Sequence, residues 1–289
     1  MNKRITILLE GGIGNQLWQV AYAHFLSQNI FSNHTVRVKS RYRNRFALKG
    51  LENFCQHIVF QSDSHTIRNE FIQNIFFERV TGLPRIKSAL FEEHGENLPS
   101  LTSRSKYVIG NFQKITYLQD CSLEFEREVI NWLDSTENTN YIPERSGVIH
   151  IRRGDYLNPF HMKSIGLLKR DYFLKAFHEL NLSVDEIAVI TDDMTTQEVE
   201  NFLGSSPRYF YGKGTRDLDC LKLLSNSSFV VASNSTFSWW GSYLGSKRLD
   251  SKTRKVALPF PFFKSLPKER EHLYFPGVVF INSEFEEVN

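Results

Sequence analysis

The sequence is poor in cysteine, in long apolar runs and in net charge, and each shortage excludes a class of protein. Its 289 residues include only 3 cysteines, Cys55, Cys121 and Cys220, which are widely spaced. This spacing matches no metal-binding pattern and does not suit a disulfide framework, so we expect a reducing cytoplasm. The apolar run at residues 5–9 is too short for a signal peptide, and no later run reaches the length of a membrane span.

The charge balance argues against a nucleic-acid partner. The formal net charge is +3, whereas nucleic-acid binders usually carry a concentrated basic stripe. Basic residues gather locally at 39–45 and 247–255. We favour a solvated surface for each run, and the alternative is contact with anionic lipid headgroups or a pyrophosphate-bearing substrate. Peripheral contact with a membrane therefore stays open.

The beginning of the chain is typical of a nucleotide-binding half. The apolar run at residues 5–9 predicts a buried parallel strand, and a glycine-rich turn follows it. Apolar residues at helical spacing then predict a helix over 15–28. The dinucleotide fingerprint fails, because Leu17 stands where the third glycine belongs and the next predicted strand, 34–39, ends in basic residues. A nicotinamide cofactor is therefore not expected.

The glycine-rich turn is the first candidate binding segment. Gly12 and Gly14 leave the backbone bare beside a helix N-terminus, so a ligand could approach closely. Asn15 and Gln16 add two side-chain amides to this segment. A plain tight turn with Asn15 as the helix N-cap is equally favoured on local grounds.

The second half of the chain has a regular pattern. A polar cluster at residues 135–140 is the best candidate for a domain boundary, which predicts domains over 1–145 and 146–289, with the last segment able to pack back on the first domain. Before the boundary the pattern is less regular, with a predicted strand at 107–112 and predicted helices at 71–80 and 123–133. Beyond it, predicted strands cover 148–151, 187–190, 209–211, 229–232 and 255–258, and predicted helices cover 171–180, 197–203, 217–225 and a segment from Thr236. This alternation implies an α/β protein with helices on both faces of a parallel sheet.

Polar clusters follow three of these strands, each at the carboxyl end. The first holds Arg152, Arg153 and Asp155, the second Asp192 and Asp193, and the third Ser233, Asn234, Ser235 and Thr236. Because the carboxyl ends of parallel strands share one edge of the sheet, the three clusters should converge on one crevice.

The chemistry of the clusters favours a nucleotide. Arginine forks and a hydroxyl-rich helix start suit a diphosphate, and an aspartate suits the paired N–H donors of guanine. Taken singly, the simpler interpretations are an ion pair between an arginine and Asp155, a capped loop at Asp192, and helix N-capping at residues 233–236. Their convergence favours the nucleotide site.

Three motifs resemble those of a known family. His150-Ile151-Arg152-Arg153-Gly154-Asp155 resembles the His-x-Arg-Arg-x-Asp motif of α-1,2-, α-1,6- and protein O-fucosyltransferases. Gly11-Gly12-Ile13-Gly14-Asn15-Gln16 is similar to an N-terminal Gly-Gly-Leu-Gly-Asn-Gln signature, and Ser235-Thr236-Phe237-Ser238-Trp239-Trp240-Gly241 to a Ser-Phe-Ser-Trp-Trp-Gly signature. Together, and in this order, they resemble glycosyltransferase family 11, the galactoside α-1,2-fucosyltransferases, in its bacterial form.

The resemblance implies a GT-B fold, with two Rossmann-like domains facing a central cleft. It implies GDP-fucose in the C-terminal domain, an acceptor held mainly by the N-terminal domain, and an inverting transfer without a metal or other cofactor. The implied acceptor is a galactose-terminated oligosaccharide in O-antigen or other surface glycan assembly, and a lipid-linked form of it is left open. The implied location is the cytoplasm, with peripheral contact at the inner face of the bacterial membrane left open.

The resemblance also implies roles for the residues of the motifs. Arg152 and Arg153 would hold the β-phosphate and stabilise the departing GDP, which is the electrostatic task of a metal elsewhere. His150 and Asp155 would shape the donor pocket, and Asp192 or Asp193 would recognise guanine. Ser235 and Thr236 would bind phosphate, and Asn15 would reach the reacting centre from the opposite domain. The remaining residues of the implied binding set are Ser233, Asn234, Gly12, Gly14 and Gln16.

Some features of the sequence leave alternatives open. Glu10 and Trp18 depart from the family pattern, and the general base is not settled among Asp155, Glu10 and His150. The alternatives for function are the same fold with another linkage, such as α-1,3, or another acceptor, and a non-catalytic binder of nucleotide or glycan.

Overall fold

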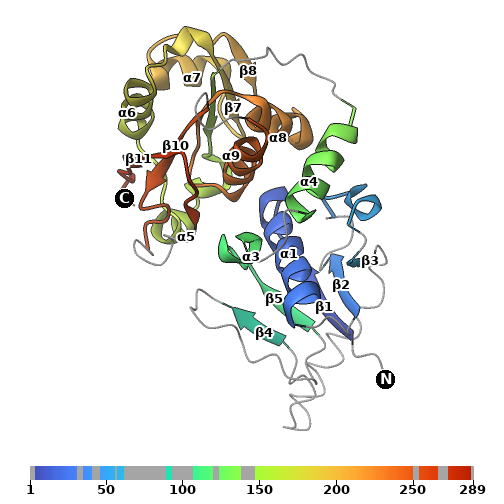
Figure 1. Cartoon of the computed structure of the whole chain (residues 1–289). Helices are drawn as coiled ribbons and strands as arrows, with labels where there is room; N and C mark the ends of the chain where they lie inside the picture. Colours follow the sequence, from blue (N-terminus) through green and yellow to red (C-terminus); the bar gives the residue numbers. More distant parts are fainter. Residues whose placement is uncertain are drawn as a thin grey trace. The chain divides into compact units, whose positions relative to one another are not determined.

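The computed structural model describes residues 4–30, 35–40, 46–55, 57–61, 89–92, 107–119, 124–137, 147–249, 254–265 and 273–287. The chain forms two compact units, Met1–Trp132 and Leu133–Asn289, each built on its own parallel sheet (Figure 1). The predicted α/β class with parallel strands is confirmed. The predicted helix at 71–80 lies outside the described residues.

The first unit has a five-stranded sheet in the order β3-β2-β1-β5-β4. Its strands are β1 (Arg4–Leu9), β2 (Thr35–Ser40), β3 (Val59–Gln61), β4 (Ala89–Glu92) and β5 (Tyr107–Gly110), and its helices are α1 (Ile13–Phe25), α3 (Thr116–Gln119) and α4 (Glu124–Ser135), which runs on into the second unit. A π-helical turn, Leu26–Ile30, extends α1. The helix α1 buries Trp18 and Tyr22 completely, so burial of its aromatic residues stabilises its position on the sheet.

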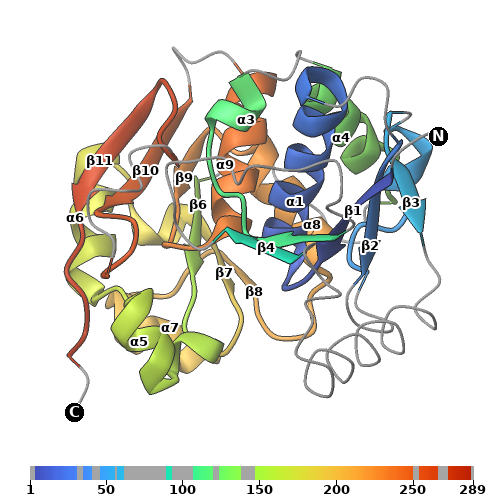
Figure 2. The same ribbon diagram turned by 90° about the horizontal axis from the view of Figure 1, so that it is seen from below.

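The second unit has a six-stranded parallel sheet in the order β11-β10-β9-β6-β7-β8 (Figure 2). The strands are β6 (Gly147–Ile151), β7 (Ile187–Thr191), β8 (Tyr209–Tyr211), β9 (Phe229–Val231), β10 (Lys255–Phe260) and β11 (Val278–Asn282), and the helices are α5 (Pro159–Ser164), α6 (Arg170–Leu180), α7 (Thr196–Leu203), α8 (Asp217–Asn226) and α9 (Thr236–Arg248). Counted from β6, this is the doubly-wound strand order 3-2-1-4-5-6. The order in which strands are added to the sheet reverses between the first strand, β6, and the fourth, β9.

Helices cover both faces of the second sheet, with α6 and α7 on one face and α8 and α9 on the other (Figures 1 and 2). Ile149 and Ile151 of β6 belong to the core packed against α6 and α7, together with Tyr172 and Phe173. Successive side chains of a strand point to opposite faces. The residue at 150 therefore points toward α8 and α9.

Two elements of the second unit were not predicted. The sequence of β11, an edge strand, has an apolar run from Val278 to Ile281 that is typical of a strand, although Phe280 is 55% exposed. The helix α5 has six residues and none of them is buried, which leaves no apolar face to detect. β11 pairs with β10, so the last described segment joins the sheet of the second unit.

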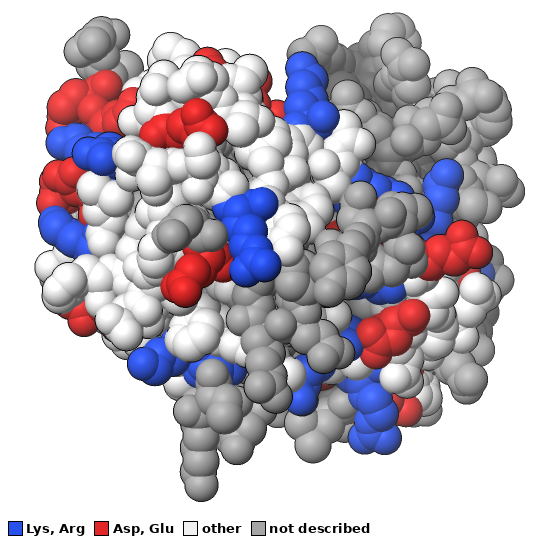
Figure 3. Space-filling view, turned by 90° about the horizontal axis from the view of Figure 1, so that it is seen from above, with Lys and Arg blue, Asp and Glu red and all other residues white. Residues whose placement is uncertain are grey.

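The second basic run is partly internal, which corrects the interpretation of this run as a solvated surface. Arg254 is 3% exposed, and its guanidinium donates to the carbonyls of Leu224 and Ser242. Arg248 pairs with Asp134 at 2.8 Å. On the face drawn in Figure 3, the acidic and basic side chains of the described residues are interspersed. None of the helices in the described part of the chain is long and apolar enough to cross a membrane.

Candidate active site

The predicted polar clusters lie at the switch point of the second sheet. β6 has β7 on one side and β9 on the other, and both pairings are parallel, so the carboxyl ends of the three strands share one edge. Ligands of open α/β sheets bind outside the carboxyl ends of the strands at such a point. The sequence prediction that three distant clusters converge there agrees with this topology.

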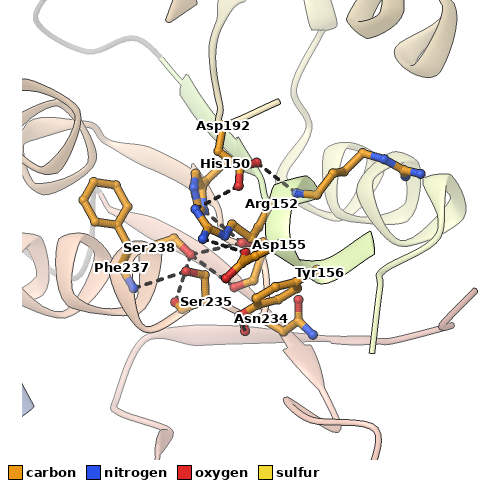
Figure 4. A network of polar contacts seen from close by, with 11 residues as sticks. His150, Arg152, Asp155, Tyr156, Asp192, Asn234, Ser235, Phe237 and Ser238 are labelled. Atoms are coloured by element: carbon orange, nitrogen blue, oxygen red, sulfur yellow. Dashed lines mark hydrogen bonds and ion pairs between the residues drawn. The ribbon is translucent and has the colours of Figure 1, made fainter. Parts of the chain in front are cut away.

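Arg152 lies between two carboxylates (Figure 4). Its guanidinium donates to Asp155 at 2.7 Å and to Asp192 at 2.9 Å, and its carbon Cζ lies 5.6 Å from the ring centroid of Tyr156. The side chain is 31% exposed. Arginine has five N–H donors, so a half-buried guanidinium held along part of its edge can still donate to an anion.

Asp192 organises the loop that carries Arg152. One carboxylate oxygen accepts from the backbone N–H of Arg153 at 3.0 Å, and the other faces Arg152. A Cβ atom at Gly154 would lie 2.3 Å from Asp192, so this approach requires glycine at position 154. Both oxygens of Asp192 are thus engaged with the loop after β6. The side chain of Asp193 is exposed, so of the two aspartates it is the better candidate for contact with a guanine base.

Arg153 points away from Arg152. Its guanidinium donates to Glu286 at 2.9 Å and lies over the ring of Phe202 of α7, with 5.7 Å from Cζ to the centroid. β6 ends at Ile151, and Arg153 has a φ of −126° and a ψ of −62°, so the backbone leaves the extended conformation where the two side chains diverge. The structure therefore does not bring the two predicted phosphate-binding guanidiniums together.

His150 is a buried, neutral member of the site. Its Nδ1 lies 2.9 Å from the hydroxyl of Ser233, and its ring lies 5.5 Å from that of Phe237. Burial lowers the pKa of His150 to about 3, and the charge of Arg152 lowers the pKa further in the same direction. The hydroxyl of Ser238 donates to the carbonyl of Ser233 at 3.2 Å, so the end of β9 and the start of α9 are joined around this histidine.

The N-terminus of α9 faces the same cluster. The side chain of Ser235 caps the helix by accepting from the N–H of Phe237 at 3.3 Å, so the simpler interpretation of residues 233–236, helix N-capping, holds for Ser235. Thr236 is the first helical residue, and the first turn contains no acidic residue. The positive end of the helix dipole at this N-terminus therefore favours an anion.

Asn234 and Tyr156 hold this corner in place. The hydroxyl of Tyr156 donates to the carbonyl of Asn234 at 3.2 Å, and the Asn234 amide donates to the carbonyl of Gly166 at 2.8 Å. Burial raises the pKa of Tyr156 well above its ordinary value, partly offset by the charge of Arg152. The side chain of Asn234 thus serves the backbone, and Tyr156 connects Arg152 with the start of α9.

One Asp-x-Asp pattern, Asp217-Leu218-Asp219, is present in the sequence, although the family resemblance implies a metal-independent reaction. Asp219 is 2% exposed and pairs with Arg216 at 2.7 Å. Burial raises the pKa of Asp217, and Arg152 opposes this shift. Residues two apart on a helix do not face each other, so the two carboxylates do not form a joint ligand pair. Within the described residues, no group of three histidine, cysteine, aspartate or glutamate side chains could hold a metal ion.

The predicted residues of the first unit surround the turn before α1. Gly11 has a φ of 78°, which favours glycine, whereas a Cβ at Gly12 would meet no atom within 4 Å. Gln16 is fully buried, donates to the carbonyl of Gly11 at 2.9 Å and accepts from Ala47 at 2.9 Å. The carbonyl oxygen of the Asn15 side chain accepts from Gln113 at 3.3 Å. Gln16 thus holds the turn before α1 in place. Gly14 lies beyond this turn, in the first turn of α1.

Three residues of the second unit were missed as contributors to the site. Tyr156 lies inside the motif that was singled out, and its position next to Asp155 was the available signal. Asp217 opens a predicted helix, and the sequence alone does not bring it near Arg152. Glu286 follows the edge strand β11, and no local pattern links it to Arg153.

The comparisons with known proteins agree with these observations. The profile of glycosyl transferase family 11 matches residues 4–259. The chain belongs to glycosyltransferase family 11. It is 27% identical over 290 residues to an alpha-1,2-colitosyltransferase of Escherichia coli, covering 92% of each chain. It is also 25% identical over 278 residues to the O-antigen biosynthesis glycosyltransferase WbnK of Escherichia coli, covering 82% of this chain and 89% of the relative.

Similarity to solved structures is weaker. The chain is 15% identical to the NodZ alpha-1,6-fucosyltransferase soaked with GDP-fucose, with a TM-score of 0.43 over 84% of this chain and 93% of the other. It is 9% identical to a glycosyl transferase of family 9 from Veillonella parvula, with a TM-score of 0.48 over 100% of this chain and 89% of the other. The family 11 enzyme is thus a glycosyltransferase with relatives in O-antigen synthesis.

Proposed function

We propose that this family 11 enzyme transfers L-fucose from GDP-fucose to the 2-hydroxyl of a terminal galactoside, with inversion at the fucose carbon C1 and without a metal. The observation that carries the proposal is the position of Arg152 beside the N-terminus of α9, a helix with no acidic residue in its first turn. Membership of family 11 and the names of the two relatives support a surface-glycan acceptor, such as a lipid-linked O-antigen repeat.

In this mechanism, Arg152 and the first N–H groups of α9 bind the β-phosphate. As the bond between fucose C1 and the phosphate oxygen breaks, negative charge grows on GDP, and fixed donors stabilise it without further reorganisation. The galactoside oxygen attacks C1 from the opposite face and loses its proton to a base. We assign Arg153 a supporting part, in place of direct phosphate binding, because its guanidinium donates to Glu286.

Three residues are candidates for the general base that accepts the proton of the galactoside hydroxyl: Asp155, Glu10 and His150. His150 is the poorest of the three, because burial lowers its pKa to about 3 and Nδ1 is engaged with Ser233. Asp155 has a half-exposed carboxylate that accepts from Arg152. Glu10 follows β1 in the first unit. Asp155→Asn and Glu10→Gln, each measured for the rate of transfer, separate these two.

A second candidate donor is GDP-colitose, favoured by the similarity to the colitosyltransferase. Colitose is fucose without the 3-hydroxyl, so the same diphosphate site would serve both donors. An enzyme built to hydrogen-bond the 3-hydroxyl would reject colitose strongly, whereas an apolar pocket would discriminate weakly against fucose. The two donors therefore need a direct comparison.

The test is a matrix of GDP-fucose, GDP-colitose and GDP-mannose against β-galactosides, with the product linkage determined by NMR. We expect an α-1,2 product from GDP-fucose. Faster transfer of colitose would replace the donor assignment, and an α-1,3 product would replace the linkage. Absence of transfer from all three donors, together with GDP binding, would favour the non-catalytic alternative.

A further inference from the structure

Residues 283–287, here called the C-terminal strap, lie along the segment that precedes α6. The N–H of Lys169 donates to the carbonyl of Glu284 at 2.8 Å, and the N–H of Glu286 donates to the carbonyl of Leu167 at 2.8 Å. Leu168 and Phe285 form an antiparallel bridge between these contacts. The strap therefore has a fixed register against residues 167–169.

Tight packing holds the strap close to the site. Gly166 has a φ of 86°, and a Cβ there would lie 2.4 Å from the ring of Phe285. On its other side, the carbonyl of Gly166 accepts from the side chain of Asn234 at 2.8 Å. Gly166 thus lies between the strap, which it contacts at Phe285, and Asn234 after β9.

A chain of charged contacts links the strap with Arg152. Glu286 accepts from Arg153 at 2.9 Å, and the backbone N–H of Arg153 donates to Asp192 at 3.0 Å. The second oxygen of Asp192 accepts from Arg152 at 2.9 Å. The Arg153 guanidinium is also covered by the ring of Phe202. The loop after β6 is therefore held at Arg153, whose side chain donates to Glu286 and whose backbone N–H donates to Asp192.

We propose that the C-terminal strap is a positioning element of the donor site, in which Glu286 holds Arg153 and thereby fixes the loop that presents Arg152 to the diphosphate. The inference rests on the proposed role of Arg152. Glu286 lies beyond residues 4–259, the part of the chain matched by the family profile, so this support comes from a segment outside the family pattern.

The experiment compares Glu286→Ala with Glu284→Ala, a matched control on the same strap. Glu284 pairs with Lys175 at 2.7 Å, and both side chains are about half exposed. Misplacement of a binding group by about 1 Å can cost on the order of 100-fold, so we expect Glu286→Ala to raise the KM for the GDP-sugar about tenfold. The KM for the acceptor and the melting temperature should stay close to those of the wild type, and Glu284→Ala should match the wild type in all three.

A charge exchange tests whether the pairing itself matters. Arg153→Glu alone should raise the KM for the donor, and Arg153→Glu combined with Glu286→Arg should restore most of it. Failure of the double variant to recover, in a folded protein, would overturn the inference by showing that Arg153 acts through something other than Glu286.

Arg152→Ala in the same assay separates the two levels of the proposal. If Arg152→Ala is inactive while Glu286→Ala has the donor KM of the wild type, the strap has no positioning role and the proposed function stands. If Arg152→Ala itself retains transfer, the proposed diphosphate site is wrong, and the inference about the strap is overturned with it.

Discussion

Replacement of Arg152 by alanine removes the one guanidinium that the structure places between Asp155, Asp192 and Tyr156. The cost to the folded state is small, because partly exposed ion pairs contribute about 0.2–1 kcal/mol each. Loss of two such pairs lowers the melting temperature by a few degrees, at about 2–4 °C per kcal/mol for a chain of this size class.

The cost to catalysis is expected to be much larger. Two charge-assisted hydrogen bonds to the departing diphosphate contribute about 1.5–3 kcal/mol each. At about 1.4 kcal/mol per factor of ten, their loss slows transfer by about 10²- to 10⁴-fold. The measurement is the initial rate of GDP release with a galactoside acceptor, alongside a thermal melt of the same sample.

Arg208→Ala is the matched control. Arg208 directly precedes β8 and its guanidinium lies over the ring of Tyr209, so it belongs to the amino ends of the parallel strands, opposite the proposed site. Its replacement should leave the rate of transfer unchanged. A rate for Arg152→Ala within about fivefold of the wild type, with both variants folded, would refute the assignment of Arg152 to the diphosphate.

Four further predictions follow from the same geometry. Gly154→Ala should reduce transfer at least tenfold with little change in melting temperature, because the new Cβ would displace Asp192 from Arg152; wild-type rates would show that Asp192 does not position the loop. Burial lowers the pKa of His150 from 6.5 to about 3, so its contribution to stability is complete above about pH 6.5 and is lost as the pH falls toward 3, by about 1.4 kcal/mol per pH unit. His150→Asn, which keeps a partner for Ser233, should show a smaller drop in melting temperature between pH 7 and pH 5.5 than the wild type, and an equal drop would contradict the assignment. GDP should raise the melting temperature while UDP and CDP do not, and Asp193→Ala should lose this selectivity; equal protection by all three nucleotides in the wild type would rule out guanine recognition. EDTA should leave the rate of transfer unchanged, and a loss restored by added Mg²⁺ or Mn²⁺ would show that the reaction needs a metal.

The second half of the sequence predicts its own secondary structure well, because its central strands are buried on both faces. β6 and β7 are buried along their whole length, which requires the continuous apolar runs that the sequence displays. The helices between them carry one apolar face, as in α6, where Tyr172, Phe173 and Phe177 are buried. α5 escapes prediction because none of its residues is buried, whereas β11 has an apolar run from Val278 to Ile281 that is typical of a strand.

The candidate site shows the same division. Local sequence predicts that polar residues follow β6, β7 and β9, since a parallel sheet places functional residues at the carboxyl ends of its strands. It also offers helix N-capping as an alternative for residues 233–236, since capping is a contact between residues close in the chain. It does not predict that Asp192 would hold the loop of Arg152, because that contact joins residues 39 positions apart.

By itself, the sequence determined the family, most of the strands and helices in the second unit, and the set of polar residues at the strand ends. Only the tertiary structure decided which of these residues face one another. The loop after β6 directs Arg152 toward Asp192 and Tyr156 and directs Arg153 toward Glu286. The physical reason is that the direction of a side chain after a strand, and its partner 133 positions away, depend on how the sheet and its last strand are assembled.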